Sequence, residues 1–135
     1  MIFTHQGAYW VEGMPEDFRI GYPRTLEEYR SEGDQLSADL AGAVYREDIR
    51  EIGEGFFEDI FAPAIEKAEK DNVPLYCGEY GVIDRAPSKD TACWFKDIHK
   101  ALSKYKIGRA IWSYKEMDFG ILGDHYSENR ASILQ

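Results

Sequence analysis

The chain has 135 residues, a net charge of -9 and 14% aromatic residues. A chain of this length can form one domain with a hydrophobic core. Its acidic charge argues against nucleic acid and anionic membranes as partners, and no apolar stretch is long enough to span a bilayer. The net charge argues neither for nor against a neutral ligand.

The first 23 residues are predicted to form a loop, because glycines and prolines interrupt them repeatedly. The loop carries several aromatic side chains, among them His5 and Trp10. Two interpretations are open: these side chains face a binding cleft, or they anchor a long loop to the body of the domain. The stretch from Met1 to His5 lacks the basic region and the apolar run of a signal peptide, so the cellular location is left open.

Helical patterns follow this loop. A capping box at Thr25–Glu28 predicts a short helical turn that is interrupted at residues 31–34, and residues 34–50 form a weakly helical pattern that contains a glycine. Residues 55–71 are a stronger helix, with apolar side chains at helical spacing. Pro63 is expected to kink this helix or to divide it into two pieces.

A further helix is predicted over residues 88–104, with Ser88 or Asp90 as its N-terminal cap. Trp94 lies on the apolar stripe of this helix and is expected in the core. His99 lies off the stripe and is expected to be exposed to solvent.

Two short strands frame this helix. Leu75–Cys77 is predicted to be a buried strand, and Arg109–Tyr114 is the second. The order strand, helix, strand implies parallel pairing. Trp112 then either points to the end of the first strand or supports the sheet as a core residue. Residues 123–135 are expected to form a short last helix whose aliphatic side chains pack inward.

Glu79 stands between Gly78 and Gly81, just after the first predicted strand. The carboxyl ends of parallel strands are where α/β folds place catalytic side chains. Taken by itself, the motif fits either a catalytic carboxylate or an ordinary surface glutamate in a turn.

Three segments of the chain together resemble glycoside hydrolase family 5, and they occur in the family's order. They are residues 75–81, similar to its seventh strand, residues 3–8 with Trp10, similar to the loop after its sixth strand, and residues 111–115 with 118–121, similar to its eighth strand and the loop beyond. The resemblance implies an α/β fold, a partial (β/α)8 TIM barrel from roughly the loop after strand 6 through strand 8. Residues 1–135 are then the carboxyl-terminal part of the catalytic domain, since a complete barrel needs about 250 residues.

The family resemblance also implies a function, the retaining hydrolysis of a β-linked polysaccharide such as cellulose or β-glucan. Glu79 is similar to the catalytic nucleophile, and Trp112 to the platform beneath the sugar. The further substrate contacts that the resemblance implies by position are His5, Trp10, Lys115 and Asp118. This chemistry needs no cofactor, and the three scattered histidines give no metal-ligand pattern. Relatives in this family are often secreted.

The resemblance leaves one catalytic group unaccounted for. The acid/base glutamate of the family follows an asparagine at the end of the fourth strand, and no Asn-Glu pair occurs here. We expect no meaningful hydrolysis by the isolated chain, since lost acid assistance costs about 10²–10⁴-fold in rate. We also expect the isolated chain to self-associate, to pair with a complementing amino-terminal half, or to be only loosely folded, because two strands leave open sheet edges. The alternative function is non-catalytic: a carbohydrate-binding module or a structural remnant of a barrel.

Overall fold

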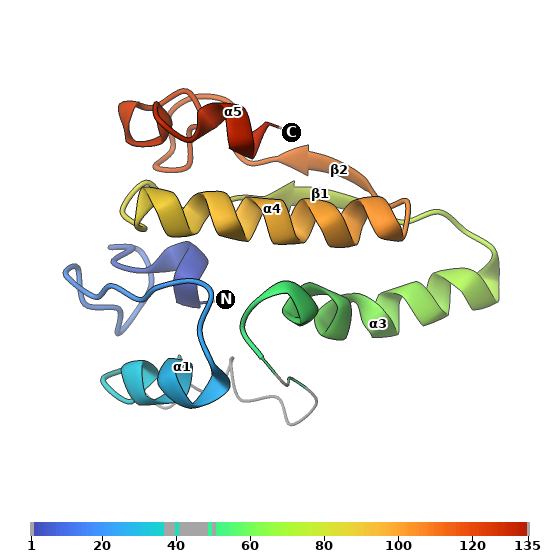
Figure 1. Cartoon of the computed structure of the whole chain (residues 1–135), viewed down its shortest axis with the longest axis horizontal. Coiled ribbons are helices and arrows are strands. Elements are labelled where there is room, and N and C mark those ends of the chain that lie inside the picture. Colours follow the sequence, from blue (N-terminus) through green and yellow to red (C-terminus); the bar gives the residue numbers. More distant parts are fainter. Residues whose placement is uncertain (1, 37–39, 41–48, 50, 135) are drawn as a thin grey trace.

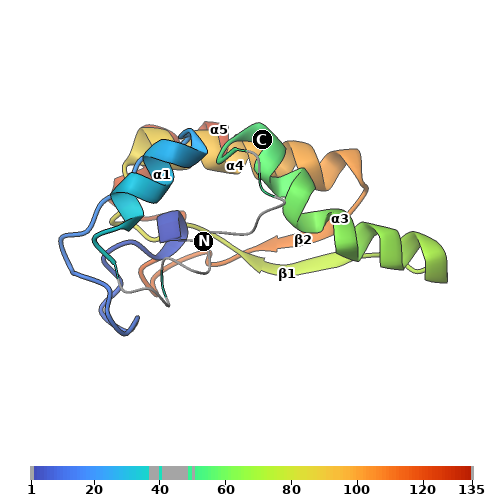
Figure 2. The same cartoon turned by 90° about the horizontal axis from the view of Figure 1, so that it is seen from below.

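The computed structural model describes residues 2–36, 40, 49 and 51–134. Its centre is a pair of parallel strands, β1 (Tyr76–Tyr80) and β2 (Gly108–Ile111), which helix α4 (Ser88–Lys104) connects. Figure 2 shows the helices gathered on one side of the strands, with the other side left open. This arrangement is that of a barrel segment, because helices cover only the outer face of a (β/α)8 sheet.

Helix α4 lies between two other helices (Figure 1). It packs against α3 (Glu54–Asp71) and against the short α5 (Arg130–Ile133). The rings of Phe57 in α3 and Trp94 in α4 meet edge to face, with centroids 5.4 Å apart. Trp94 is thus a core residue, as predicted. Burial of each large apolar side chain stabilises the fold by about 1.5–3 kcal/mol.

Buried polar side chains hold the amino-terminal segment to this core. The segment begins with a 3-10 helix, η1 (Ile2–His5), and continues as a loop. The buried amide of Gln6 donates to the carbonyls of Phe3 in η1 and of Ile20 in the loop, and its Oε1 accepts a 2.9 Å hydrogen bond from the Ile20 N–H. The hydroxyl of Tyr22 donates to the Asp97 carboxylate of α4 at 2.9 Å. These bonds hold the loop, which is rich in glycine and proline, in a defined conformation.

Helix α1 (Leu26–Gly33) begins at the predicted capping box. The Thr25 hydroxyl accepts from the Glu28 N–H at 3.2 Å, and the Glu28 carboxylate accepts from the Thr25 N–H at 2.9 Å. These bonds from Thr25 hold the pKa of the Glu28 carboxyl below its usual value. The predicted interruption at residues 31–34 is wrong, because the helix continues to Gly33. The predicted helical pattern over residues 34–50 lies mostly outside the described residues.

The two strands are parallel neighbours, as predicted, but their bounds and burial differ from the prediction. β1 includes Glu79, whereas the sequence places a buried strand at Leu75–Cys77 and Glu79 after it. Helices cover only one face of β1, and the register shifts between Cys77 and Tyr80, so Tyr76 is 68% exposed although Tyr80 is buried. β2 ends at Ile111, so Trp112 lies just beyond the strand and not within it. A strand with apolar residues on both faces is buried only when both faces are covered.

The predicted helices over 55–71 and 88–104 are confirmed with small shifts in their bounds. Pro63 lies inside α3, and the helix continues through it as one element. Capping of α4 by Ser88 or Asp90 is wrong, since no side chain caps its first turn. The Asp90 carboxylate instead accepts a hydrogen bond from the Tyr22 N–H. Within the described residues, no helix combines the length and the apolar character needed to cross a membrane.

His99 and the last helix depart from the prediction as well. His99 is only 9% exposed, and its Nε2 lies 2.8 Å from the Tyr80 hydroxyl. Apolar periodicity places His99 off the core stripe, because periodicity alone does not reveal that a buried hydroxyl can hydrogen-bond to the imidazole. In the last helix Ile133 is fully buried, as expected, whereas the next residue, Leu134, is exposed.

Candidate active site

The position of Glu79 within β1 determines which face of the sheet its side chain leaves. The next residue, Tyr80, is buried against Trp94 and Phe95 of α4. Because successive residues of a strand face opposite sides, Glu79 projects from the open face of the sheet. Its side chain is exposed, and no described residue forms a hydrogen bond or ion pair with its carboxylate. The carboxylate is therefore accessible to a ligand.

Trp112 follows β2 at the same end of the sheet. Its backbone N–H donates to the Tyr80 carbonyl oxygen at 2.8 Å, next to Glu79. The chains approach closely here: a Cβ added at Gly81 would lie 1.9 Å from the Trp112 carbonyl oxygen, so only glycine fits. The Trp112 side chain is 40% exposed. Two neighbouring parallel strands thus bring a carboxylate and an indole to one place.

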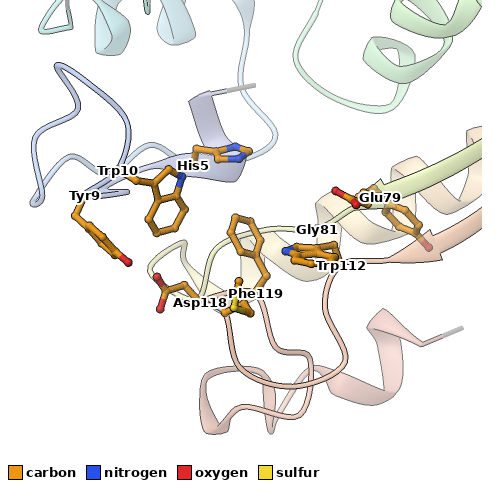
Figure 3. A pocket seen from close by; sticks show the side chains of 10 residues that line it. His5, Tyr9, Trp10, Glu79, Gly81, Trp112, Asp118 and Phe119 are labelled. Atoms are coloured by element: carbon orange, nitrogen blue, oxygen red, sulfur yellow. The ribbon is translucent and has the colours of Figure 1, made fainter.

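The pocket that these two residues line has a volume of about 590 Å³. Phe119, in the loop after β2, joins it to the amino-terminal segment: its ring centroid lies 5.5 Å from that of His5 and 6.2 Å from that of Trp10. Figure 3 shows Phe119 between Trp10 and Trp112. Most of the wall is therefore aromatic, a surface suited to a ligand with flat apolar faces. The remaining lining residues are Tyr9, Tyr80, Gly81, Met117 and Asp118.

A strained turn brings Asp118 to the pocket. Glu116, Met117 and Asp118 have φ values of 66°, 61° and 58°, in the left-handed region that non-glycine residues rarely adopt. The Ser113 hydroxyl donates to the Glu116 carbonyl at 2.8 Å, and the Asp118 carbonyl accepts from the Asp84 N–H at 2.7 Å. Strain of this kind persists only where surrounding bonds enforce it, and it is concentrated at ligand sites.

The residues singled out in the sequence fall into two groups. Those that line the pocket are Glu79, Trp112, His5, Trp10 and Asp118. Lys115 lies outside the lining, and its exposed Nζ is 3.8 Å from the Glu116 carboxylate. Five lining residues were not singled out, and they are Tyr9, Tyr80, Gly81, Met117 and Phe119. The signal for Tyr9 is its position beside Trp10 in an aromatic loop, whereas only the fold shows that Phe119 joins the two walls.

Burial shifts the pKa values of several titratable groups around β1. Burial raises the pKa values of the Cys77 thiol and the Tyr80 phenol. Burial also lowers the pKa of His99. At the rim, burial first and then the negative charge of Asp118 raise the pKa of Asp84. Burial thus favours the uncharged form of each of these groups.

Two carboxylates line the pocket, those of Glu79 and Asp118. Figure 3 shows them on different sides of Phe119, Glu79 toward Trp112 and Asp118 toward Tyr9. They do not form a closely spaced pair. Within the described residues, no group of three His, Cys, Asp or Glu side chains is arranged to hold a metal ion.

The known proteins similar to this chain include endoglucanases and a cellodextrinase. No protein-family model matches the chain. Endoglucanase C of Acetivibrio thermocellus is 34% identical over 144 residues, which cover 98% of this chain and 37% of that protein. Almost the whole chain is thus similar to part of this endoglucanase. Cellodextrinase A of Ruminococcus flavefaciens is 36% identical to this chain over 107 residues, which cover 79% of this chain and 24% of that protein. The chain thus spans little more than a third of the length of Endoglucanase C.

Solved structures share the fold of this chain over part of their own length. The cellulose synthase subunit Z of Clostridioides difficile matches 98% of this chain, and 37% of its own, with a TM-score of 0.67 and 20% identity. Cel5A of Thermotoga maritima, in complex with mannotriose, matches 98% of this chain, and 34% of its own, with a TM-score of 0.61 and 22% identity. The resemblance to glycoside hydrolase family 5 is thereby confirmed, and this chain has the fold of part of a (β/α)8 barrel.

Proposed function

We propose that the chain is the carboxyl-terminal part of the catalytic domain of a retaining glycoside hydrolase acting on a β-linked polysaccharide such as cellulose or β-glucan. Glu79 is the nucleophile, and Trp112 is the platform for the sugar that Glu79 attacks. The observation that carries the proposal is their position at the same end of two neighbouring parallel strands, where both line one pocket. The similarity to Endoglucanase C supports a cellulose-like substrate.

Retaining hydrolysis proceeds through a covalent intermediate. The Glu79 carboxylate attacks the anomeric carbon and forms an ester, while the bond to the leaving-group oxygen breaks. A second carboxyl group protonates that oxygen and then takes a proton from the water that hydrolyses the ester. The accessible carboxylate and the exposed indole beside it suit the first of these steps.

The second carboxyl group is proposed to come from outside this pocket lining. A retaining pair is about 5–5.5 Å apart. Asp118, the other carboxylate of the lining, lies across Phe119 from Glu79. We assign Asp118, with His5 and Trp10, to sugar contacts, and Lys115 to a contact from the rim. Without the acid group the isolated chain is expected to hydrolyse polysaccharide about 10²–10⁴-fold more slowly than a complete site.

A substrate whose leaving group needs no protonation tests the nucleophile separately from the acid. With dinitrophenyl β-cellobioside, the isolated chain is expected to release up to one equivalent of dinitrophenolate and to carry a glycosyl ester on Glu79, detected by mass spectrometry of peptides. Glu79→Gln is expected to abolish both. Glu116→Gln is the matched control, because Glu116 is exposed and lies outside the lining. No ester, or an ester that persists in Glu79→Gln, contradicts the proposed nucleophile.

A non-catalytic carbohydrate-binding role is the second candidate. It is favoured by the aromatic lining of a pocket that has no closely spaced pair of carboxylates. In this case cello-oligosaccharide binding survives in Glu79→Gln, is lost in Trp112→Ala, and is accompanied by no ester. Absence of any sugar binding would instead indicate a structural remnant.

A further inference from the structure

Tyr9 forms part of the pocket wall that the proposed chemistry does not use. Its side chain is 69% exposed and lines the pocket together with Trp10. Figure 3 shows the rings of Tyr9 and Trp10 on the opposite side of Phe119 from Glu79 and Trp112. The pocket therefore has exposed aromatic side chains on two sides.

Neighbouring side chains hold the Tyr9 ring. The ring of Trp10 meets it edge to face, with centroids 4.8 Å apart. The Arg85 guanidinium lies 5.8 Å from the centroid of the Tyr9 ring, within cation–π range, and donates a hydrogen bond to the Gly7 carbonyl. These contacts restrict the ring while most of its surface stays accessible. An aromatic side chain ordered in advance loses little entropy when a ligand binds.

The segment that carries Arg85 connects both walls of the pocket. The Ile83 N–H donates to the Thr4 carbonyl at 3.1 Å, and the Asp84 N–H donates to the Asp118 carbonyl at 2.7 Å. The hydrogen bond of Arg85 ties the same segment to the loop that carries the tyrosine. Because this segment follows β1 directly, the tyrosine is held in a defined position relative to the proposed nucleophile.

We propose that Tyr9, held by Arg85, is a second sugar platform that takes a further pyranose ring of the same β-linked glycan. Pyranose faces carry C–H groups that pack on aromatic rings, and their edges carry hydroxyls that hydrogen-bond to groups such as the Asp118 carboxylate. The inference rests on the proposed function, since it takes the glycan as bound at Trp112. We therefore expect the site to prefer glycans that are long enough to contact both platforms.

The test compares the affinity of the chain for cellobiose and for cellopentaose by calorimetry. Tyr9→Ala is expected to weaken cellopentaose binding about tenfold, equivalent to about 1.4 kcal/mol, and cellobiose binding by clearly less. Tyr9→Phe keeps the ring and is expected to keep the affinity for cellopentaose. Arg85→Met removes the cation and the bond to Gly7, and is expected to weaken cellopentaose binding in the same direction as Tyr9→Ala.

Tyr114→Ala is the matched control, because Tyr114 is 70% exposed and does not line the pocket. Circular dichroism of each variant shows whether the fold is kept. Equal losses for the two sugars in Tyr9→Ala, or an unchanged affinity for cellopentaose, overturn the second platform while binding by the parent chain still upholds the proposed function. Failure of the parent chain to bind either sugar overturns both.

Discussion

The backbone N–H of Trp112 donates a 2.8 Å hydrogen bond to the carbonyl oxygen of Tyr80. The bond lies at the end of the strand pairing, beyond the shift in register that follows Cys77. Since Tyr80 directly follows Glu79, the bond fixes the proposed nucleophile relative to the proposed sugar platform. It depends on Gly81, where a side chain would collide with the Trp112 carbonyl.

Gly81→Ala is therefore expected to disrupt the site. The added Cβ would lie 1.9 Å from the Trp112 carbonyl oxygen, so the backbone after β2 must move. We expect a loss of about 1–3 kcal/mol in the free energy of unfolding, together with a loss of cellopentaose affinity. Urea denaturation and calorimetry measure the two effects. In the control Gly78→Ala, the new Cβ would meet only the Tyr76 ring, at 3.9 Å, and similar losses in both variants would contradict this account.

The buried hydrogen bond between Tyr80 and His99 gives a second prediction. The Tyr80 hydroxyl lies 2.8 Å from His99 Nε2. Tyr80→Phe leaves that nitrogen without its partner in a buried position, which is expected to cost about 1–3 kcal/mol in the free energy of unfolding. The control Tyr105→Phe removes a 3.0 Å bond to the Glu58 carboxylate in a more accessible place, so a smaller loss is expected. Equal losses of the free energy of unfolding in the two variants would contradict a larger contribution from the buried bond.

His99 also makes stability depend on pH. Burial first, and then the positive charge of Arg109, lower the pKa of His99 in the folded chain. The unfolded chain therefore binds a proton at His99 more readily than the folded chain, and stability falls as the pH falls below about 6.5, the ordinary histidine value. His99→Gln removes this titration. Its loss of stability between about pH 7 and pH 5 is expected to be smaller than that of the parent, measured by urea denaturation at each pH. Parallel pH profiles would contradict the prediction.

Much of the fold can be predicted because the local patterns agree with one another. The apolar spacing of residues 55–71 and 88–104 predicts α3 and α4, and the order of strands and helices predicts the parallel pairing. Family motifs predict that Glu79 and Trp112 meet, and both line one pocket. These features depend on short stretches of chain, which the sequence specifies directly.

Features that depend on partners distant in the sequence are missed. The burial of His99 depends on the hydroxyl of Tyr80, 19 positions earlier. The exposure of Tyr76 depends on which faces of β1 are covered, and the apolar composition of this strand fits a sheet covered on both faces. The position of Tyr9 depends on Arg85, 76 positions later in the chain, which no periodicity connects to it.

The open face of the strands leads to the last prediction, that the isolated chain self-associates. Tyr76 is 68% exposed on β1, and in the two-stranded sheet of the described residues each strand has one unpaired edge. Exposed edges and apolar faces favour pairing with another chain. Sedimentation velocity is expected to show dimers or larger species. Tyr76→Lys, which places a charge on this face, is expected to shift the chain toward monomer, whereas Tyr114→Lys in the loop after β2 is not. A polypeptide that supplies the complementing part of the barrel is expected to compete with self-association, and a monomeric parent chain with a sharp cooperative melt would contradict the prediction.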